Sequence, residues 1–247
     1  MQVSIADKLQ AHYECACGHF NKEQILGVFL YGSQNYNTDL PNSDIDTKAI
    51  YIPTLQELAF DKPVSVELEL PNGEHCEVKD IREMIKNFKK QNINFVEILF
   101  TDYAIINPKY YQLWDYYFLN NRNEIARYNV HAAVHSMSHQ ASHTLKQNPE
   151  DGKKLSNALR LLYFLEGYIC GRDYINCLRS YNNRATLLRE LKSGEYKGSL
   201  TLLSRMLEIA FEDFKTADLH HLTDKTKQAK LDQLMQEGCL ELIKLIF

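Results

Sequence analysis

The sequence has few of the residues that mark the more specialised classes of protein. Its 247 residues include only six scattered cysteines, too few for a disulfide scaffold, which predicts reduced thiols in a cytoplasmic protein. No run of about 18 apolar residues occurs, so neither a membrane span nor a membrane partner is expected. The first twenty residues lack a basic segment followed by an apolar one, which argues against a signal peptide.

The chain also has no excess of positive charge. Its formal net charge of -4 excludes a global positive field for a long nucleic-acid duplex, but it allows a local basic groove. Hydrophobic residues make up 45% and charged residues 24%, as in a globular rather than a disordered chain. This length suffices for one large domain or two modest ones.

Periodicity in the sequence changes character at about residue 107. The predicted strands, identified from apolar runs and from alternation of apolar with polar residues, cover residues 25–31, 45–52, 64–70 and 75–80. The predicted helices before this point cover residues 4–20, 54–60, 81–90 and 95–100. Only helical spacing follows. We therefore expect an α+β domain over residues 1–107 and an all-helical domain over residues 108–247 that closes a cleft.

The segment "FLYGSQNYNTDLPNSDIDTKAI" joins two strands by a polar loop. Residues two apart on a strand point to the same face, so Asp44 and Asp46 are expected to project together while Ile45 is buried. Adjacent carboxylates repel each other unless a cation lies between them, and Mg²⁺ prefers oxygen ligands, including those of phosphate. The backbone after Gly32, with the Ser33 hydroxyl, can bind the phosphate itself.

This arrangement resembles the polymerase-beta nucleotidyltransferase superfamily, whose signature is an apolar strand, Gly-Ser, a spacer and Asp-x-Asp. Together with "EVKDIREM", "NFVEILF" and "GKKLSNALRLLYFLEGYICG", it makes the chain similar to the predicted nucleotidyltransferases of the RNA-repair-pathway polymerase-beta type. The resemblance covers roughly two thirds of the chain. It implies a polymerase-beta-like core, a mixed sheet with helices, followed by a helical domain, with Mg²⁺ or Mn²⁺ as cofactor and an NTP as co-substrate.

The resemblance also assigns roles to particular residues. Asp44 and Asp46 are the predicted catalytic metal ligands, and a later strand supplies a third carboxylate. We favour Glu77 for that position, and Glu67, Glu69 and Asp80 remain alternatives, as does a plain solvent-facing acidic ribbon. The predicted nucleotide-binding residues are Gly32, Ser33, Gln34, Ser43, Lys153, Lys154 and Arg160.

A basic region in the helical half provides independent support for an anion site. Lys153 and Lys154 open a predicted helix, where positive charge is unfavourable for the helix dipole unless an anion lies nearby. Residues 151–200 contain nine Lys or Arg against five Asp or Glu, which predicts a basic wall facing the metal site. The alternative is an exposed basic face. Lys192 and Lys197, near loop glycines, are expected to lie away from the triphosphate.

Two further patterns resemble metal sites. His131, His135, His139 and His143 recur every fourth residue, but they drift about 40° per step around a helix and have no carboxylate between them. A polar stripe between helices or along the cleft is favoured, where it can also contact a nucleobase or acceptor. The segment "HYECACGH", residues 12–19, lacks the usual Cys-x2-Cys spacing, which favours a helix end with buried thiols over zinc.

The sequence therefore predicts a metal-dependent nucleotidyltransferase that moves a nucleoside monophosphate from an NTP to an acceptor hydroxyl and releases pyrophosphate. An RNA or tRNA end suits the basic wall as acceptor, and a protein acceptor stays open. The alternative is a nucleotide-sensing or antitoxin-like module that binds or modifies a protein partner. Tyr36, near the Gly-Ser turn, is a candidate for stacking on the base.

Overall fold

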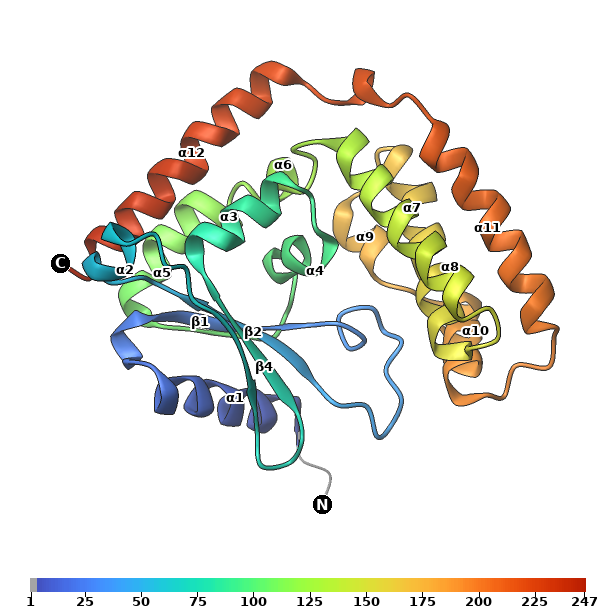
Figure 1. Ribbon diagram of the computed structural model, residues 1–247, viewed down its shortest axis with the longest axis horizontal. Coiled ribbons are helices and arrows are strands. Elements are labelled where there is room, and N and C mark those ends of the chain that lie inside the picture. The colour runs from blue at the N-terminus through green and yellow to red at the C-terminus, as the bar shows by residue number, and fades with distance from the viewer. Residues whose placement is uncertain (1–3) are drawn as a thin grey trace.

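The computed structural model describes residues 4–247 as a mixed five-stranded sheet with helices on both faces and a helical layer beyond it (Figure 1). The strands are β1 (Ile25–Tyr31), β2 (Asp46–Tyr51), β3 (Ser65–Glu69), β4 (His75–Asp80) and β5 (Ala104–Ile106). Their order is β3-β4-β2-β1-β5, in which β2 and β4 are parallel and the other neighbours antiparallel. The predicted α+β class is confirmed.

Helices make up the rest of the regular structure. Within residues 4–247 the α-helices are α1 (Ile5–His19), α2 (Leu55–Ala59), α3 (Ile81–Lys89), α4 (Ile93–Val96), α5 (Pro108–Trp114), α6 (Arg122–Ile125), α7 (Val130–Gln147), α8 (Gly152–Ile169), α9 (Tyr174–Leu178), α10 (Asn182–Ser193), α11 (Leu200–Thr216) and α12 (Lys225–Lys244). None of these described helices has the length and apolar character needed to cross a membrane. The described strands all precede residue 107, while the domain boundary at that point stays a prediction.

Local sequence signals account for several of these elements. The Ser4 side chain caps α1 by accepting the Asp7 N–H at 3.1 Å, and Thr54 caps α2 in the same way. The predicted β3–β4 hairpin forms, with Gly73 at a φ of +80° in its turn. Strand β3 is an edge strand, on which Val66 is 41% exposed whereas Leu68, two residues later on the same face, is buried.

The sheet separates two hydrophobic clusters. One face, which includes Val28 and Ala49, packs against α1. The other face belongs to a larger cluster that continues through α3 and α5 into the helical layer, where the rings of Phe29 and Trp114 lie 5.1 Å apart. The end of β1 and the start of β2 therefore face the helices α7, α8 and α10 across the loop that connects the two strands (Figure 1).

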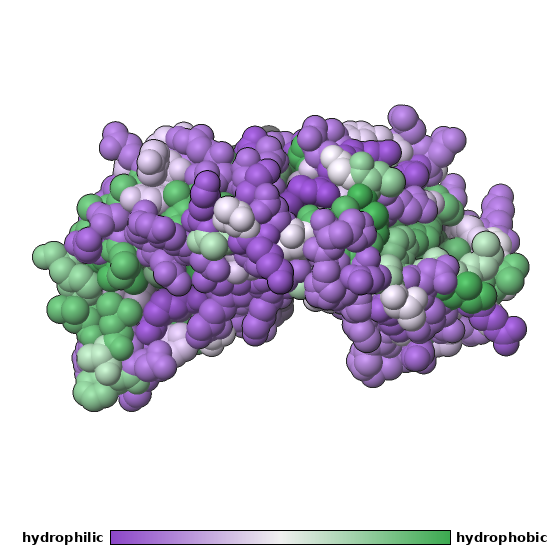
Figure 2. Space-filling model, turned by 90° about the horizontal axis from the view of Figure 1, so that it is seen from above, coloured by the Kyte–Doolittle hydropathy of each residue, from purple (hydrophilic) through white to green (hydrophobic). Residues whose placement is uncertain are grey.

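Apolar side chains also reach the surface. Figure 2 shows a mostly hydrophilic face on which hydrophobic residues gather toward the two ends of the molecule. Leu202, Met206 and Ile209 are exposed on α11, spaced so that they form one stripe along the helix. Leu240 and Phe247 are exposed at the C-terminal end of the chain.

Candidate functional site

The sheet register brings the Gly-Ser turn and the Asp-x-Asp motif together. Tyr31 at the end of β1 pairs with Asp46 at the start of β2, so Gly32 lies beside the Asp46 carboxylate. Gly32 has a φ of +89°, and a Cβ at this position would lie 3.0 Å from Asp46 Oδ2. Glycine is thus needed both for the backbone conformation and for the close approach. Ile45, between the two aspartates, is buried as predicted.

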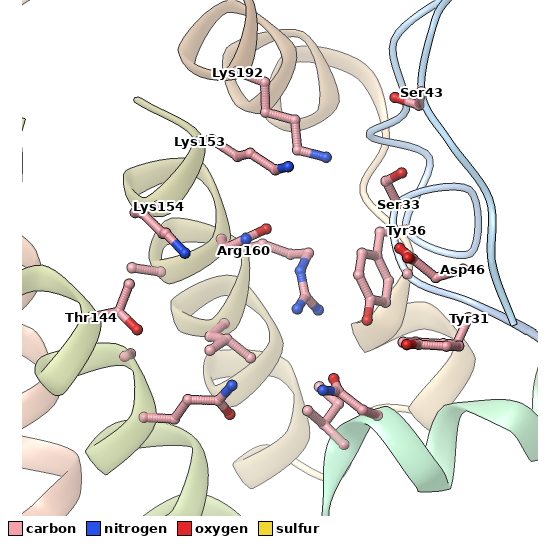
Figure 3. Close-up of a pocket in the computed structure, with 18 of the residues that line it drawn as sticks. Tyr31, Ser33, Tyr36, Ser43, Asp46, Thr144, Lys153, Lys154, Arg160 and Lys192 are labelled. Atoms are coloured by element: carbon pink, nitrogen blue, oxygen red, sulfur yellow. The ribbon is translucent and has the colours of Figure 1, made fainter. Parts of the chain in front are cut away.

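Both motifs line one cavity of about 560 Å³ between the sheet and the helical layer. Its volume lies within the range of roughly 300–1,000 Å³ that is typical of small-molecule sites. From the strand side, the predicted residues that line it are Gly32, Ser33, Ser43, Asp44 and Asp46. From the helical side, the cations that line it are Lys153, Lys154, Arg160 and Lys192 (Figure 3).

Helix α8 presents its predicted basic residues on one face. Lys153, Asn157 and Arg160 are spaced by four and three residues, so they lie one above another along the cavity wall. At the start of α8, a Cβ on Gly152 would lie 2.2 Å from the Leu191 carbonyl oxygen, so glycine lets α8 approach α10 closely. The positive end of the α8 dipole and its lysines thus lie near the same cavity.

The Arg160 guanidinium lies buried without full hydrogen bonding. The side chain is 6% exposed, and its carbon Cζ is 3.6 Å from the centre of the Tyr36 ring. Its Nε and Nη1 have no hydrogen-bond partner among residues 4–247. Buried donors of a charged group are costly to leave unpaired. An anion in the cavity that Arg160 lines would supply the missing acceptors.

Lys192 was expected to lie away from the site, and this prediction is wrong. Its Nζ donates to the Thr38 carbonyl oxygen at 2.9 Å, which holds α10 against the loop between β1 and β2. Burial, together with the charges of Arg160 and Lys153, lowers the pKa of Lys192 to about 8. The sequence could not show this because the loop and α10 are about 150 residues apart, a separation that only tertiary packing closes.

A buried glutamate that the sequence did not single out organises the Gly-Ser turn. Glu97 follows α4, is fully buried, and accepts hydrogen bonds from the Gly32 N–H at 3.1 Å and the Tyr36 hydroxyl at 2.6 Å. The Asn35 amide donates to the same carboxylate at 3.3 Å. Burial raises the pKa of Glu97, although the hydrogen bond from Tyr36 and the nearby charge of Arg160 both act to lower it. Tyr36 is thereby fixed between Glu97 and Arg160.

Two of the predicted nucleotide-binding residues, Gln34 and Ser43, support the loop between β1 and β2. Gln34 does not line the cavity; its side-chain amide donates to the Asp44 carbonyl oxygen at 2.9 Å. The Ser43 hydroxyl lines the cavity and also accepts the Leu40 N–H at 2.8 Å. Both contacts fix the loop immediately before Asp46.

The predicted third carboxylate is engaged elsewhere. Glu77 lies on β4 opposite Lys48, whose Nζ is 2.5 Å from Glu77 Oε2, and it accepts the Tyr31 hydroxyl at 3.3 Å. Glu77 lines a neighbouring groove rather than the main cavity. Within residues 4–247, the ligand atoms of Asp44, Asp46 and Glu77 do not all lie within 4.8 Å of one another. A shared three-carboxylate site therefore stays a prediction.

A second buried network supports the Asp-x-Asp strand from behind. Glu74, in the β3–β4 turn, accepts the Ile45 N–H at 3.2 Å and lies 2.5 Å from Lys8 Nζ. His12 lies between Glu74 Oε2, at 3.3 Å, and the Thr47 hydroxyl, at 2.8 Å. The residues on both sides of Asp46 are thus held by α1 and the hairpin. His12 points to this network rather than to a zinc site formed by residues 12–19.

This network predicts an acid-sensitive contribution to stability. Burial would raise the pKa of Glu74, but hydrogen bonds from Lys8, Asn72 and His12 outweigh it and lower the pKa from 4.5 to about 2. The contribution is therefore present above pH 4.5 and lost as the pH falls toward 2, and it amounts to about 3 kcal/mol. Glu74→Gln should flatten the fall in the free energy of unfolding over this range, measured by urea denaturation.

The control is Glu67→Gln, on the neighbouring strand, where the side chain is 65% exposed. It should keep the wild-type pH profile. An unchanged profile for Glu74→Gln would show that the Glu74 network does not stabilise the fold.

Helix α7 contributes to the cavity, but not through its histidines. Gln140, Ala141 and Thr144 line the cavity, whereas none of the predicted stripe residues does. His131 and His135 lie next to each other, with ring centres 4.2 Å apart, on the part of α7 that faces the segment between α11 and α12. The four histidines of α7 therefore do not line the cleft.

Neither a protein-family model nor a curated protein matches this chain. Two carboxylates on the sheet side face four cations on the helical side. One of these cations, Arg160, has two buried donor atoms that no group of the described residues accepts from.

Proposed function

We propose that the chain is a metal-dependent nucleotidyltransferase that takes an NTP into this cavity. The observation that carries the proposal is the juxtaposition, in one cavity, of the Asp44–Asp46 pair with Lys153, Lys154 and Arg160. These groups come from segments more than 100 residues apart, so their convergence is a property of the fold. It supports the polymerase-beta-like core that the sequence resembles.

The charges in the cavity match those of a metal-bound triphosphate. The four cations in the cavity outnumber the two aspartates. One bound divalent cation would raise the net positive charge further, until it roughly balances the four or so negative charges of a triphosphate. A neutral ligand would leave the lysines repelling one another. The charge balance therefore favours a polyphosphate over an uncharged substrate.

The two aspartates fit a hard divalent cation. Burial raises the pKa of Asp46 and the charge of Asp44 acts in the same direction, whereas Lys153 opposes them from across the cavity. A cation between the carboxylates would relieve their repulsion. Mg²⁺ or Mn²⁺ bound there would neutralise charge on the phosphates during transfer.

The chain's own residues would orient the nucleotide for in-line attack. An acceptor hydroxyl oxygen bonds to the α-phosphorus, the bond from that phosphorus to the bridging oxygen breaks, and pyrophosphate leaves while the hydroxyl proton passes to solvent. Lys153, Lys154 and Arg160 would hold the departing phosphates, and the Ser33 hydroxyl with the backbone after Gly32 would add donors. Tyr36 is buried against Arg160, which favours a packing role over base stacking.

Replacing Ser33 with alanine should lower the turnover number more than it raises the Michaelis constant. One neutral hydrogen bond contributes only about 1 kcal/mol to ground-state binding. Its contribution grows as charge develops on the leaving pyrophosphate, so the turnover number should fall by about tenfold or more. Steady-state kinetics would test this, with Ser136→Ala, an exposed serine of α7 outside the cavity, as the control that should leave both constants unchanged. A large rise in the Michaelis constant with an unchanged turnover number would restrict Ser33 to binding the ground state.

One observation favours a second function, nucleotide sensing without transfer. The Lys48–Glu77 ion pair neutralises the carboxylate that would complete a second metal site. A sensor would bind the NTP through Asp44, Asp46 and the basic wall and signal to a protein partner. Either function would use the two aspartates to hold the metal-bound NTP, so an assay for transfer decides between them.

The acceptor can be sought directly. Purified protein would be incubated with each labelled NTP, Mg²⁺ or Mn²⁺, and either total RNA or protein from a cell lysate. Labelled products would be separated and identified by mass spectrometry. Transfer to RNA or protein supports the enzyme, metal-dependent NTP binding without transfer supports the sensor, and neither binding nor transfer overturns both.

A further inference from the structure

A cluster of histidines lies at the start of α7, on the opposite end of that helix from the cavity. His131 of α7 and His220, in the segment between α11 and α12, have ring centres 3.7 Å apart. Asp218 lies in the same segment. One ligand atom from each of His131, Asp218 and His220 lies within 4.8 Å of the other two, and no other three such side chains meet this criterion within residues 4–247.

Other contacts hold the two parts of the cluster together. The Thr223 hydroxyl accepts the Val130 N–H at 3.2 Å, and the Leu219 N–H lies 3.4 Å from His131 Nδ1. The segment 217–224 therefore runs across the N-terminal end of α7, as Figure 1 shows. The ligand set is thus placed by packing between residues that are about 90 apart in sequence.

We propose that His131, Asp218 and His220 form a binding site for a divalent transition metal of the zinc class. Imidazole nitrogens with one carboxylate are typical zinc ligands, whereas Mg²⁺ prefers oxygen ligands alone. Ligand atoms bound tetrahedrally to zinc are about 3.3 Å apart, so the ligand atoms of these side chains would have to move about 1 Å closer to one another. Asp218 and His220 are exposed, Asp218 Oδ1 accepts the His220 N–H at 3.1 Å, and His135 beside His131 can supply a fourth ligand.

The position of the site suggests a structural role. The segment that carries Asp218 and His220 leads into α12, which returns to the sheet-bearing half of the molecule. There Asp232 of α12 accepts the Tyr128 hydroxyl at 2.9 Å and lies 2.5 Å from Lys89 Nζ of α3. A metal on His131 and His220 would therefore fix the segment that connects α11, in the helical layer, to α12.

Co²⁺ can test the site without reference to nucleotide transfer. The full chain carrying Asp44→Asn and Asp46→Asn, which removes the proposed magnesium ligands, would be titrated with Co²⁺ and then with competing Zn²⁺. We expect one metal per chain with the visible absorption of a four- or five-coordinate nitrogen and oxygen site, displaced by Zn²⁺. Zn²⁺ should also raise the melting temperature.

Two variants in that background identify the ligands. His220→Ala, at an exposed position, and His131→Gln should each weaken Co²⁺ binding by at least about tenfold and abolish the thermal shift. His143→Ala, on the exposed part of the same helix, should change neither. No stoichiometric binding, binding that survives His220→Ala and His131→Gln, or a sulfur-to-cobalt charge-transfer band that indicates a cysteine ligand would each overturn the proposal.

Discussion

Replacing Asp44 or Asp46 with alanine is expected to abolish metal-dependent nucleotide transfer while the chain stays folded. Either change removes half of the proposed oxygen ligand pair on the cavity wall. Metal-ion stabilisation of transferring phosphates is worth several kcal/mol, so activity should fall by about 10³-fold or more. Without metal, the melting temperature should be unchanged or higher, because burial and Asp44 already disfavour the charged form of Asp46, as its raised pKa shows.

The matched control is Asp213→Ala, an exposed aspartate of α11 outside the cavity. It should keep wild-type activity at every Mg²⁺ concentration. Transfer assays with labelled NTP, and thermal melts with and without Mg²⁺, would be run on all three variants. Full activity in Asp44→Ala or Asp46→Ala would exclude these residues as essential metal ligands.

Reversing the charge of both Lys153 and Lys154 is expected to remove measurable NTP binding. Both side chains line the cavity, and Lys153 is close enough to Asp46 to oppose the rise in its pKa. Two unit charges near a partly buried triphosphate contribute several kcal/mol, and their reversal replaces attraction by repulsion. The dissociation constant of a non-hydrolysable NTP should rise by about 100-fold or more. Calorimetric titration at low and moderate salt would measure it.

The control for charge must leave the cavity intact, and Lys192 cannot serve because it lines the same wall. Lys227→Glu with Lys230→Glu gives the same change in net charge on an exposed face of α12. This pair should bind the nucleotide nearly as well as the wild type. Equal losses in both double variants would indicate a diffuse basic surface, and no loss in either would place the triphosphate against the strand side alone.

Local sequence signals were sufficient for much of the sheet and for the convergence of the two strand motifs. The break at Gly32, the alternation around Ile45 and the turn at Gly73 each depend on a few neighbouring residues. Strand β5 was missed because its three residues have no period of their own and owe their conformation to pairing with β1.

The groups that organise the cavity were harder to find because their roles are nonlocal. Glu97 lies in an apolar stretch that predicts a helix, and only packing places its carboxylate under the Gly32 N–H. Likewise, Lys48 follows the motif by two residues, but its pairing with Glu77 depends on the parallel register of β2 and β4. The His131–His220 contact joins α7 to a segment that has no motif of its own.

The most direct test of the central claim compares the fate of two labels. The protein would be incubated with Mg²⁺, total RNA and lysate protein, and the same NTP labelled either at the α- or at the γ-phosphate. Nucleotidyl transfer predicts that the α label becomes attached to an acceptor and the γ label appears only in pyrophosphate, with both signals lost in Asp46→Ala. Attachment of the γ label to an acceptor, or its release as free phosphate at the same rate in Asp46→Ala, would contradict the account.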